Sequence, residues 1–113
     1  MKKIYIVIIL SLVALVACDK EDFGLSDCLN NKIREFEKSD YACTKGANVK
    51  EYEFMNEKVY VFDPGLCGAD MTLEVMDEDC NTLGYLGGLI GNMKINGIIF
   101  ITESKFIKTI WER

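Results

Sequence analysis

Residues 49–65 read VKEYEFMNEKVYVFDPG and contain two β-prone runs separated by a polar turn. The first run, residues 49–54, alternates apolar and polar side chains near its end, and the second, residues 59–62, is β-branched and aromatic throughout. Two such runs joined by a turn at Asn56-Glu57 predict an antiparallel hairpin. Pro64-Gly65 ends the hairpin, because proline has no N–H for a strand ladder and glycine accepts a positive φ.

The β pattern continues toward the C-terminus. Residues 71–76 and 82–86 are predicted strands joined by the polar turn 77–79. A tight turn precedes the apolar residues 98–101, and residues 105–111 alternate polar with β-branched or aromatic side chains, which predicts a terminal strand. We therefore expect a mostly antiparallel sheet of four to six strands that grows as a meander.

One helix is predicted on the N-terminal side of the hairpin, over residues 28–38. Ser26-Asp27 supplies an N-cap, and Leu29, Ile33 and Phe36 recur at the spacing of one helix face. A single apolar stripe means a single packed face. The expected fold class is α+β, with one N-terminal helix packed on the sheet and the chain's only tryptophan buried in the sole core.

The N-terminus has the pattern of an export signal. Two lysines follow Met1, and residues 4–17 form an apolar run whose one polar residue is Ser11. A transmembrane helix needs about 20 apolar residues, so this shorter run favours a cleaved signal peptide. We assign residues 1–17 to the signal peptide, 18–27 to a tether and 28–113 to a single small domain.

Leu15-Val16-Ala17-Cys18 resembles the lipobox of bacterial lipoproteins. The resemblance implies that the Cys18 thiol receives a diacylglyceryl group and that cleavage follows Ala17. Two or three acyl chains, at about 0.8 kcal/mol per buried CH₂, would hold the protein permanently on a membrane. The alternatives are an ordinary signal peptide with Cys18 as a structural thiol, or an uncleaved anchor.

Asp19-Lys20-Glu21-Asp22 follows the lipobox directly and resembles an export tag of lipoproteins from Bacteroidota-type Gram-negative bacteria. That resemblance implies an outer-membrane location, with the domain facing the cell surface. The alternative is a solvated, charged tether that only holds the domain away from the lipid head groups.

Composition excludes several classes of function. The 113 residues allow one domain, and the absence of histidine removes Ser-His and Cys-His nucleophilic catalysis and the usual zinc hydrolases. Without residues 1–17 the chain has eleven basic against eighteen acidic side chains, a net charge of −7. Because such a polyanion repels phosphate, we expect no nucleic-acid partner.

Four cysteines remain once Cys18 is assigned to lipid: Cys28, Cys43, Cys67 and Cys80. An even set in an exported domain indicates disulfides, and four cysteines allow three connectivities. We favour Cys28 with Cys43 and Cys67 with Cys80, because each pair brackets one local unit. A zinc site is the alternative, but the chain has no C-x-x-C knuckle.

Glycine is concentrated between residues 84 and 92, where Gly84, Gly87, Gly88 and Gly91 are followed by Asn92. Backbone amides of such a loop can cradle phosphate or carboxylate, but the G-x-G-x-x-G order is missing. The alternative is an irregular loop whose glycines allow close backbone packing. We take this loop as the candidate binding face, since recognition loops sit on rigid scaffolds.

Five acidic residues flank one predicted strand and could converge on a hard cation such as Ca²⁺. Their spacing is not that of an EF-hand, and solvated turn carboxylates are the alternative, so we expect no cofactor. A carboxylate pair acting on a glycan is the corresponding hydrolase alternative. The five candidates are Asp63, Asp70, Asp77, Glu78 and Asp79.

Several segments together resemble a family of small uncharacterised lipoproteins from Bacteroidota-type bacteria. The resemblance covers roughly residues 28–112 and implies export, lipidation and a single domain, with no assigned activity. The segments that carry it are VYVFDPG at 59–65, CGAD at 67–70, CNTLGYLGG at 80–88, Gly91-Asn92 and Ile110-Trp111.

Two classes of function follow from these observations. The first is a non-catalytic binding module on a lipid tether, with an unknown protein or glycan as partner, and the lack of a catalytic motif favours it. The second is a small carboxylate- or metal-dependent enzyme acting on an envelope or extracellular substrate. Convergence of the acidic residues in one concavity would favour the second class.

Overall fold

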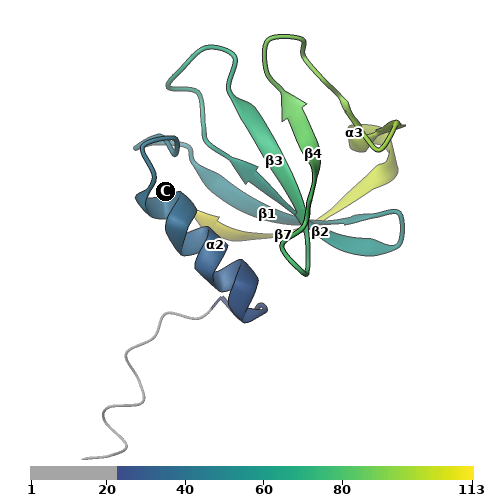
Figure 1. Ribbon diagram of the computed structural model, residues 1–113, viewed down its shortest axis with the longest axis horizontal. Helices are drawn as coiled ribbons and strands as arrows, with labels where there is room; N and C mark the ends of the chain where they lie inside the picture. Colours follow the sequence, from purple (N-terminus) through teal and green to yellow (C-terminus); the bar gives the residue numbers. More distant parts are fainter. Residues whose placement is uncertain (1–22) are drawn as a thin grey trace, which may run out of the picture.

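The computed structural model describes residues 23–113 and places a helix on one face of an antiparallel sheet (Figure 1). The predicted α+β class is confirmed. The predicted signal peptide, Cys18 and the export tag lie outside the described residues. The elements are α2 (Asp27–Lys38), β1 (Asn48–Phe54), β2 (Glu57–Asp63), β3 (Thr72–Asp77), β4 (Thr82–Gly87), β5 (Lys94–Ile95), β6 (Ile98–Ile99), α3 (Phe100–Glu103) and β7 (Ser104–Glu112).

Helix α2 begins at the predicted cap. The Ser26 hydroxyl accepts a hydrogen bond from the Leu29 N–H at 3.3 Å, which satisfies one of the free amides of the first turn. Leu29 and Ile33 are buried against the sheet, and Phe36 is packed beside them. The predicted apolar stripe is therefore the face that contacts the sheet.

The main sheet has the strand order β4-β3-β2-β1-β7, and every neighbouring pair is antiparallel. The predicted hairpin is β1–β2, but its turn is Met55-Asn56, one residue before the predicted Asn56-Glu57, and both turn residues have positive φ, 54° and 63°. A two-residue turn with positive φ at both positions has a backbone twist that matches the twist of the two strands it joins. Strands β1 to β4 follow the predicted meander, but β7 departs from it by returning to the free side of β1.

Each face of the sheet has its own hydrophobic cluster, so the prediction of a sole core is wrong. Strand β2 contains four consecutive buried residues, of which Tyr60 and Phe62 face α2 while Val59 and Val61 face the other side. The second cluster is covered by β5, β6 and α3. Trp111 is half-buried on the helix face, with its ring 6.0 Å from that of Phe36.

A buried carboxylate and a phenol lie beneath α2. Glu51 is buried and stands opposite Tyr60 in the β1–β2 ladder. Burial, the negative charges of Glu51 and Glu78, and a hydrogen bond with the Glu51 side chain together raise the pKa of Tyr60 to about 12. The Tyr60 phenol therefore stays protonated at neutral pH.

All four cysteines of the domain form disulfides, as predicted, but the predicted pairing is wrong. The bonds join Cys28 to Cys80 and Cys43 to Cys67, with sequence separations of 52 and 24 residues. The first ties the start of α2 to the β3–β4 turn, and the second ties the α2–β1 connection to the β2–β3 connection. Each disulfide therefore links two segments that only the folded sheet brings together.

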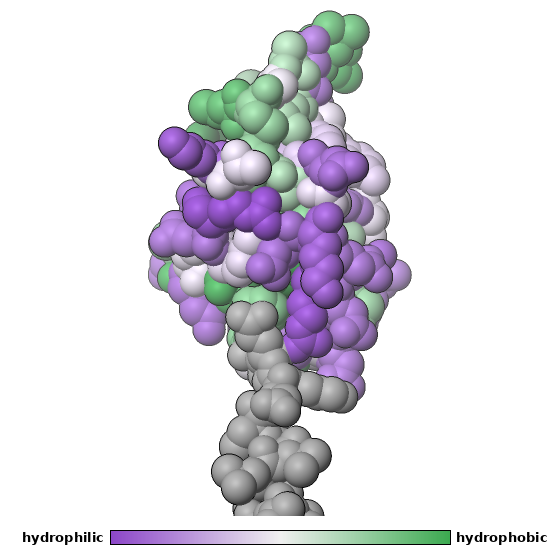
Figure 2. Space-filling model, turned by 90° about the vertical axis from the view of Figure 1, so that its left-hand side faces the viewer, coloured by the Kyte–Doolittle hydropathy of each residue, from purple (hydrophilic) through white to green (hydrophobic). Residues whose placement is uncertain are grey.

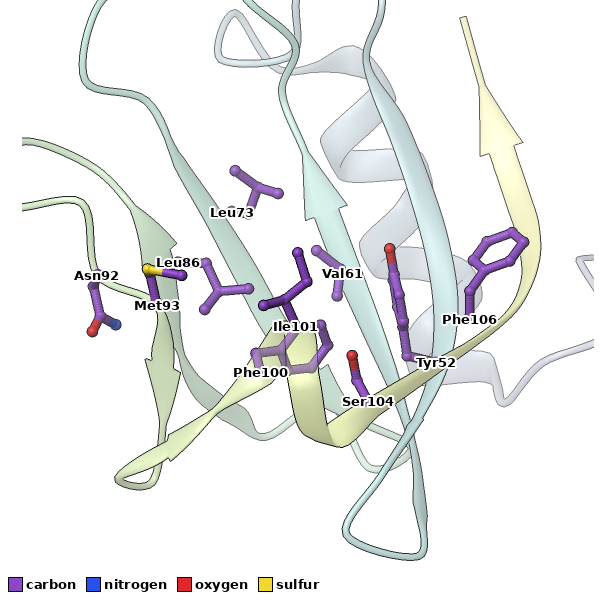
Figure 3. A pocket seen from close by; sticks show the side chains of 10 residues that line it. All are labelled: Tyr52, Val61, Leu73, Leu86, Asn92, Met93, Phe100, Ile101, Ser104 and Phe106. Carbon is purple, nitrogen blue, oxygen red and sulfur yellow. The ribbon is translucent and has the colours of Figure 1, made fainter.

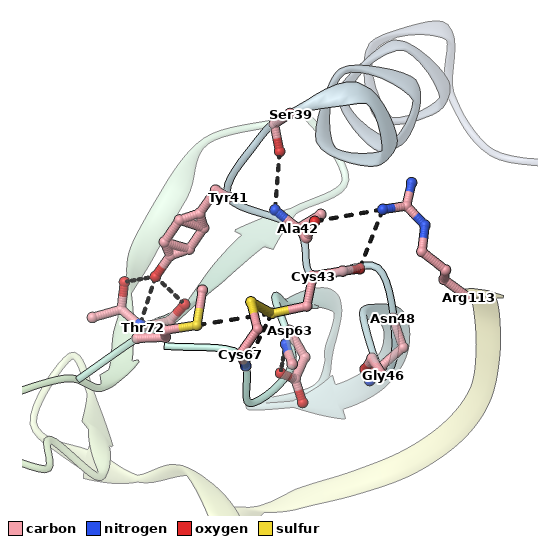
Figure 4. The surroundings of a disulfide bond; sticks show 12 residues. Ser39, Tyr41, Ala42, Cys43, Gly46, Asn48, Asp63, Cys67, Thr72 and Arg113 are labelled. Atoms are coloured by element: carbon pink, nitrogen blue, oxygen red, sulfur yellow. Dashed lines mark hydrogen bonds between the residues drawn. A yellow bond between two sulfur atoms is a disulfide. The ribbon is translucent and has the colours of Figure 1, made fainter. Parts of the chain in front are cut away.

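The C-terminal residue, Arg113, is hydrogen-bonded to the segment that contains Cys43 of the second disulfide (Figure 4). The Arg113 guanidinium donates to the carbonyl of Cys43 at 3.2 Å and also to the carbonyls of Ala42 and Glu37. On the other side, the Tyr41 hydroxyl accepts from the Thr72 N–H at 2.7 Å. The long α2–β1 connection is thereby attached to both β7 and β3.

Candidate binding site

An apolar cavity of about 410 Å³ opens on the sheet face away from α2 (Figure 3). Every strand of the main sheet contributes to it, and α3 and the segment before β5 add the remaining wall. The lining residues are Tyr52, Val61, Leu73, Leu86, Asn92, Met93, Phe100, Ile101, Ser104 and Phe106.

The strand register brings the cavity floor together. Tyr52 stands opposite Phe106 in the β1–β7 ladder, and their rings lie 5.7 Å apart in an edge-to-face arrangement. Leu73 stands opposite Leu86 in the β3–β4 ladder. Because directly opposed residues of antiparallel strands project to the same face, these pairs form one continuous apolar surface.

Helix α3 supplies the wall that stands over this surface. The apolar run 98–101 is strand only as far as Ile99, and the chain then turns, with the Phe100 N–H donating to the Met93 carbonyl at 3.0 Å. Phe100 is 6% exposed and packs against Tyr52 and Phe54 at ring distances of 5.2 and 5.0 Å. Ile101, the next residue, is 75% exposed and stands at the mouth.

Two hydroxyl groups interrupt the apolar lining, those of Tyr52 and Ser104. Burial raises the pKa of Tyr52 above its ordinary value of 10, and the negative charge of Asp63 adds to this effect. Tyr52 is therefore a neutral phenol at physiological pH. The cavity as a whole suits an uncharged group.

The glycine-rich segment lies beside the cavity, and local backbone geometry explains its glycines. Gly84 belongs to β4, where an added Cβ would approach the Ile95 side chain at 2.9 Å. Gly88 has a φ of +78°, and an added Cβ would meet the Thr72 side chain at 2.9 Å. These glycines allow close packing, the second of the two interpretations that the sequence left open.

Asn92 closes this loop and does not project as a free ligand. Its side-chain amide donates to the carbonyls of Tyr85 and Lys94 at 2.6 and 2.9 Å. Its backbone N–H donates to the Gly87 carbonyl at 3.0 Å, and its own carbonyl accepts from Gly87. The loop is thereby folded back along the outer edge of β4.

Apolar side chains gather at the end of the molecule that carries the β2–β3 and β4–β5 connections (Figure 2). Leu66 in the first connection, and Leu89 and Ile90 in the second, are almost fully exposed. This end lies opposite the first turn of α2 (Figure 1). Large exposed aliphatic side chains at adjacent loop tips are typical of interaction surfaces.

Three of the five acidic candidates, Asp77, Glu78 and Asp79, line one open concavity of about 490 Å³ together with Glu57 and Lys58, whereas Asp63 and Asp70 do not line it. Asp63 accepts from the Gly65 N–H, and Asp77 accepts from the N–H groups of Asp79 and Asn81, each carboxylate closing its own turn. Partial burial works against the ionised form of Asp77, but these hydrogen bonds outweigh it and lower the pKa. Within residues 23–113, no three acidic or thiol groups are placed to hold a metal ion.

The cavity itself was not found by sequence reasoning. Its residues come from six elements and the segment before β5, and their convergence depends on β7 pairing with β1 and on the turn at Phe100. The available signal was Phe106, an aromatic residue that alternates with lysine in a terminal strand. It predicted the strand but not the surface to which it belongs.

The comparisons with known proteins give one family. Residues 34–113, more than half of the chain, match a family described as a domain of unknown function (DUF6970). No curated protein and no solved structure matches the chain. In the part of the chain that the structure describes, no helix is long and apolar enough to span a membrane.

Proposed function

Because the chain belongs to the DUF6970 family, whose role is not assigned, we propose its function from its own surface: a non-catalytic binding module whose cavity receives an apolar group of a partner. The observation that carries this proposal is the cavity beside Ile101 and Phe106, which leaves large apolar side chains exposed at its mouth. Pockets with apolar walls and few polar groups are the usual form of binding sites.

The acidic residues support binding over catalysis. A hydrolase of the carboxylate type needs two acids on either side of a shared cleft. Here the cavity lining contains no acidic residue, and the carboxylates of Asp63 and Asp77 are engaged by backbone N–H groups of their own turns. The acidic concavity lined by Glu57, Asp77, Glu78 and Asp79 is the site that the enzyme alternative would use, but its Asp77 carboxylate is already engaged by the N–H groups of Asp79 and Asn81.

We further propose that the module is exported and anchored to the outer membrane through lipid on Cys18. The lipobox-like sequence supports this, and the five residues 18–22, which precede the packed Phe23, could reach up to about 18 Å if extended. Helix α2 begins at one end of the domain, and the apolar loop tips lie at the other (Figure 1). An anchored domain could therefore present its apolar end away from its attachment point.

A Cys18→Ser change tests the anchor. We expect the variant to remain an unprocessed precursor, because only the cysteine thiol can receive the diacylglyceryl group. Mass spectrometry of the N-terminal peptide from membranes gives the result. An unmodified Cys18 thiol in the wild-type protein would contradict the anchor and leave the binding proposal standing.

Two methionines of nearly equal exposure test the cavity. Met93 is 58% exposed and lines the cavity, whereas Met55 is 56% exposed and sits at the β1–β2 turn. In the full-length protein in phosphatidylcholine nanodiscs, with ¹³C-labelled methionine methyl groups, we expect indole to shift the Met93 signal saturably and to leave Met55 unchanged.

The matched variant is Ile101→Asp, which places a charge at the mouth on an exposed side chain. We expect it to weaken indole binding about fivefold, equivalent to roughly 1 kcal/mol. Equal, non-saturating shifts of both methionines in the wild-type protein would show that the cavity is not a binding site.

A further inference from the structure

The two outer edges of the main sheet differ in how they are covered. The edge of β4 is occupied by its own following loop, through the backbone bonds between Gly87 and Asn92 and the bond from Asn92 to the Tyr85 carbonyl. The edge of β7 has no pairing strand within residues 23–113. It is also the longest strand, with nine residues. An uncovered edge presents a row of unpaired N–H and C=O groups to another chain.

The free edge borders the apolar cavity. Ser104 and Phe106, which line the cavity, belong to β7 and face the same side of the sheet as Tyr52. Figure 3 shows the Phe106 ring beside Tyr52 at the β7 side of the group. A strand added to β7 would therefore direct every second side chain toward this apolar surface.

The opposite face of β7 has positive charge in an acidic protein. Lys105 and Lys108 are exposed and stand opposite Glu53 and Glu51 in the ladder. Among the described residues, neither lysine has a carboxylate within 4.0 Å, since the one such pair joins Lys32 to Glu35. Acidic side chains on an added strand would reach these lysines directly.

We propose that the partner is an extended peptide segment with alternating acidic and apolar residues, which pairs with the free edge of β7. Its backbone extends the sheet, its apolar side chains enter the cavity beside Phe106, and its acidic side chains approach Lys105 and Lys108. This deepens the proposed function and rests on it, because the cavity supplies the apolar subsite.

Charge also argues against a second copy of this chain as the added strand. Pairing of β7 with itself across a two-fold axis would place Lys105 and Lys108 of both copies along one shared face. Like charges at neighbouring positions of a ladder are destabilising. Edge lysines and the two register shifts in the β1–β7 ladder are features that discourage self-association, and they leave an acidic strand as the better-matched occupant.

The probe is the peptide acetyl-Glu-Leu-Glu-Leu-Glu-amide, added to the full-length protein in phosphatidylcholine nanodiscs. We expect slower amide hydrogen exchange along β7 and a shift of the Met93 methyl signal. A peptide of the same composition without alternation, acetyl-Glu-Glu-Glu-Leu-Leu-amide, should produce neither effect, and N-methylation of the leucine nitrogens should abolish the exchange protection.

Lys105→Glu and Lys58→Glu form a matched pair, because each residue stands opposite Glu53, one in β7 and the other in β2. We expect Lys105→Glu to weaken peptide binding about three- to tenfold and Lys58→Glu to leave it unchanged, with salt at about 0.5 M reducing the difference. Equal effects of the two variants would overturn the charge assignment and with it the proposed partner.

The outcomes separate this inference from the proposed function. If indole still shifts Met93 but the alternating peptide protects no β7 amide, the strand partner is wrong and the cavity stands. If neither probe binds, both proposals fail. Protection of β7 without peptide, together with a dimer in solution, would show that a second copy covers the edge and would overturn the inference.

Discussion

Replacement of Cys28 and Cys80 by serine is expected to lower the free energy of unfolding by about 4 kcal/mol. The cysteines are 52 residues apart, and the entropy lost by the unfolded chain on closing a loop of that length corresponds to roughly this value. Small domains are stable by only about 5–15 kcal/mol, so the variant should be close to unfolding at physiological temperature. Urea denaturation monitored by circular dichroism measures the change.

The second disulfide provides the matched comparison. Cys43 and Cys67 are 24 residues apart, so replacing both should cost about 3.5 kcal/mol on the same basis. The Cys28–Cys80 variant should also retain the hydrogen bond from the Ser26 hydroxyl to the Glu78 carbonyl, 3.1 Å long, which holds the same two segments together. Wild-type stability in the serine variants would show that the long-range disulfides do not form.

Local patterns predicted helix α2 and strands β1 to β4 and β7, but they missed helix α3, and they did not predict how the elements come together in the fold. The Ser26 cap, the β1–β2 hairpin and the terminal strand each depend on residues that are close in the sequence. The disulfide pairing depends on which loops become neighbours in the folded sheet. The fact that two cysteines flank the same helix or strand contains no information about that. A signal for the second hydrophobic cluster was present in residues 59–62, since consecutive apolar residues in a strand indicate burial on both faces.

The sequence predicted that residues 84–92 form an unusual glycine-rich loop, but it did not predict where the binding cavity lies. The concentration of glycine correctly marked an unusual loop, but positive φ and close contacts at Gly88 explain it. The large exposed side chains of that loop are the apolar Leu89 and Ile90, and the concentration of glycine gave no reason to single them out. The cavity arises because β7 pairs with β1 after three short elements, and no spacing in the sequence specifies that order.

Phe100→Ala is expected to cost about 3–5 kcal/mol of stability, the range for deleting a buried aromatic ring. Phe100 is 6% exposed and its ring packs edge-to-face against Tyr52 and at a tilt against Phe54, so its loss leaves a void in the second hydrophobic cluster. The neighbouring Ile101→Ala is the control, because a side chain 75% exposed buries little area. That variant should unfold within about 0.5 kcal/mol of the wild type.

The void left by Phe100→Ala also gives a test that separates packing from function. It is continuous with the cavity, so indole should bind this variant more deeply and raise its unfolding midpoint as indole concentration rises above the dissociation constant. Thermal unfolding followed by circular dichroism, with and without indole, measures the recovery.

If the Phe100 variant is as stable as Ile101→Ala, the ring does not hold α3 against the sheet, and the wall of the cavity is not the one described above. If it is destabilised but indole restores nothing, the void has collapsed, and the apolar surface beside Tyr52 is maintained by Phe100 itself.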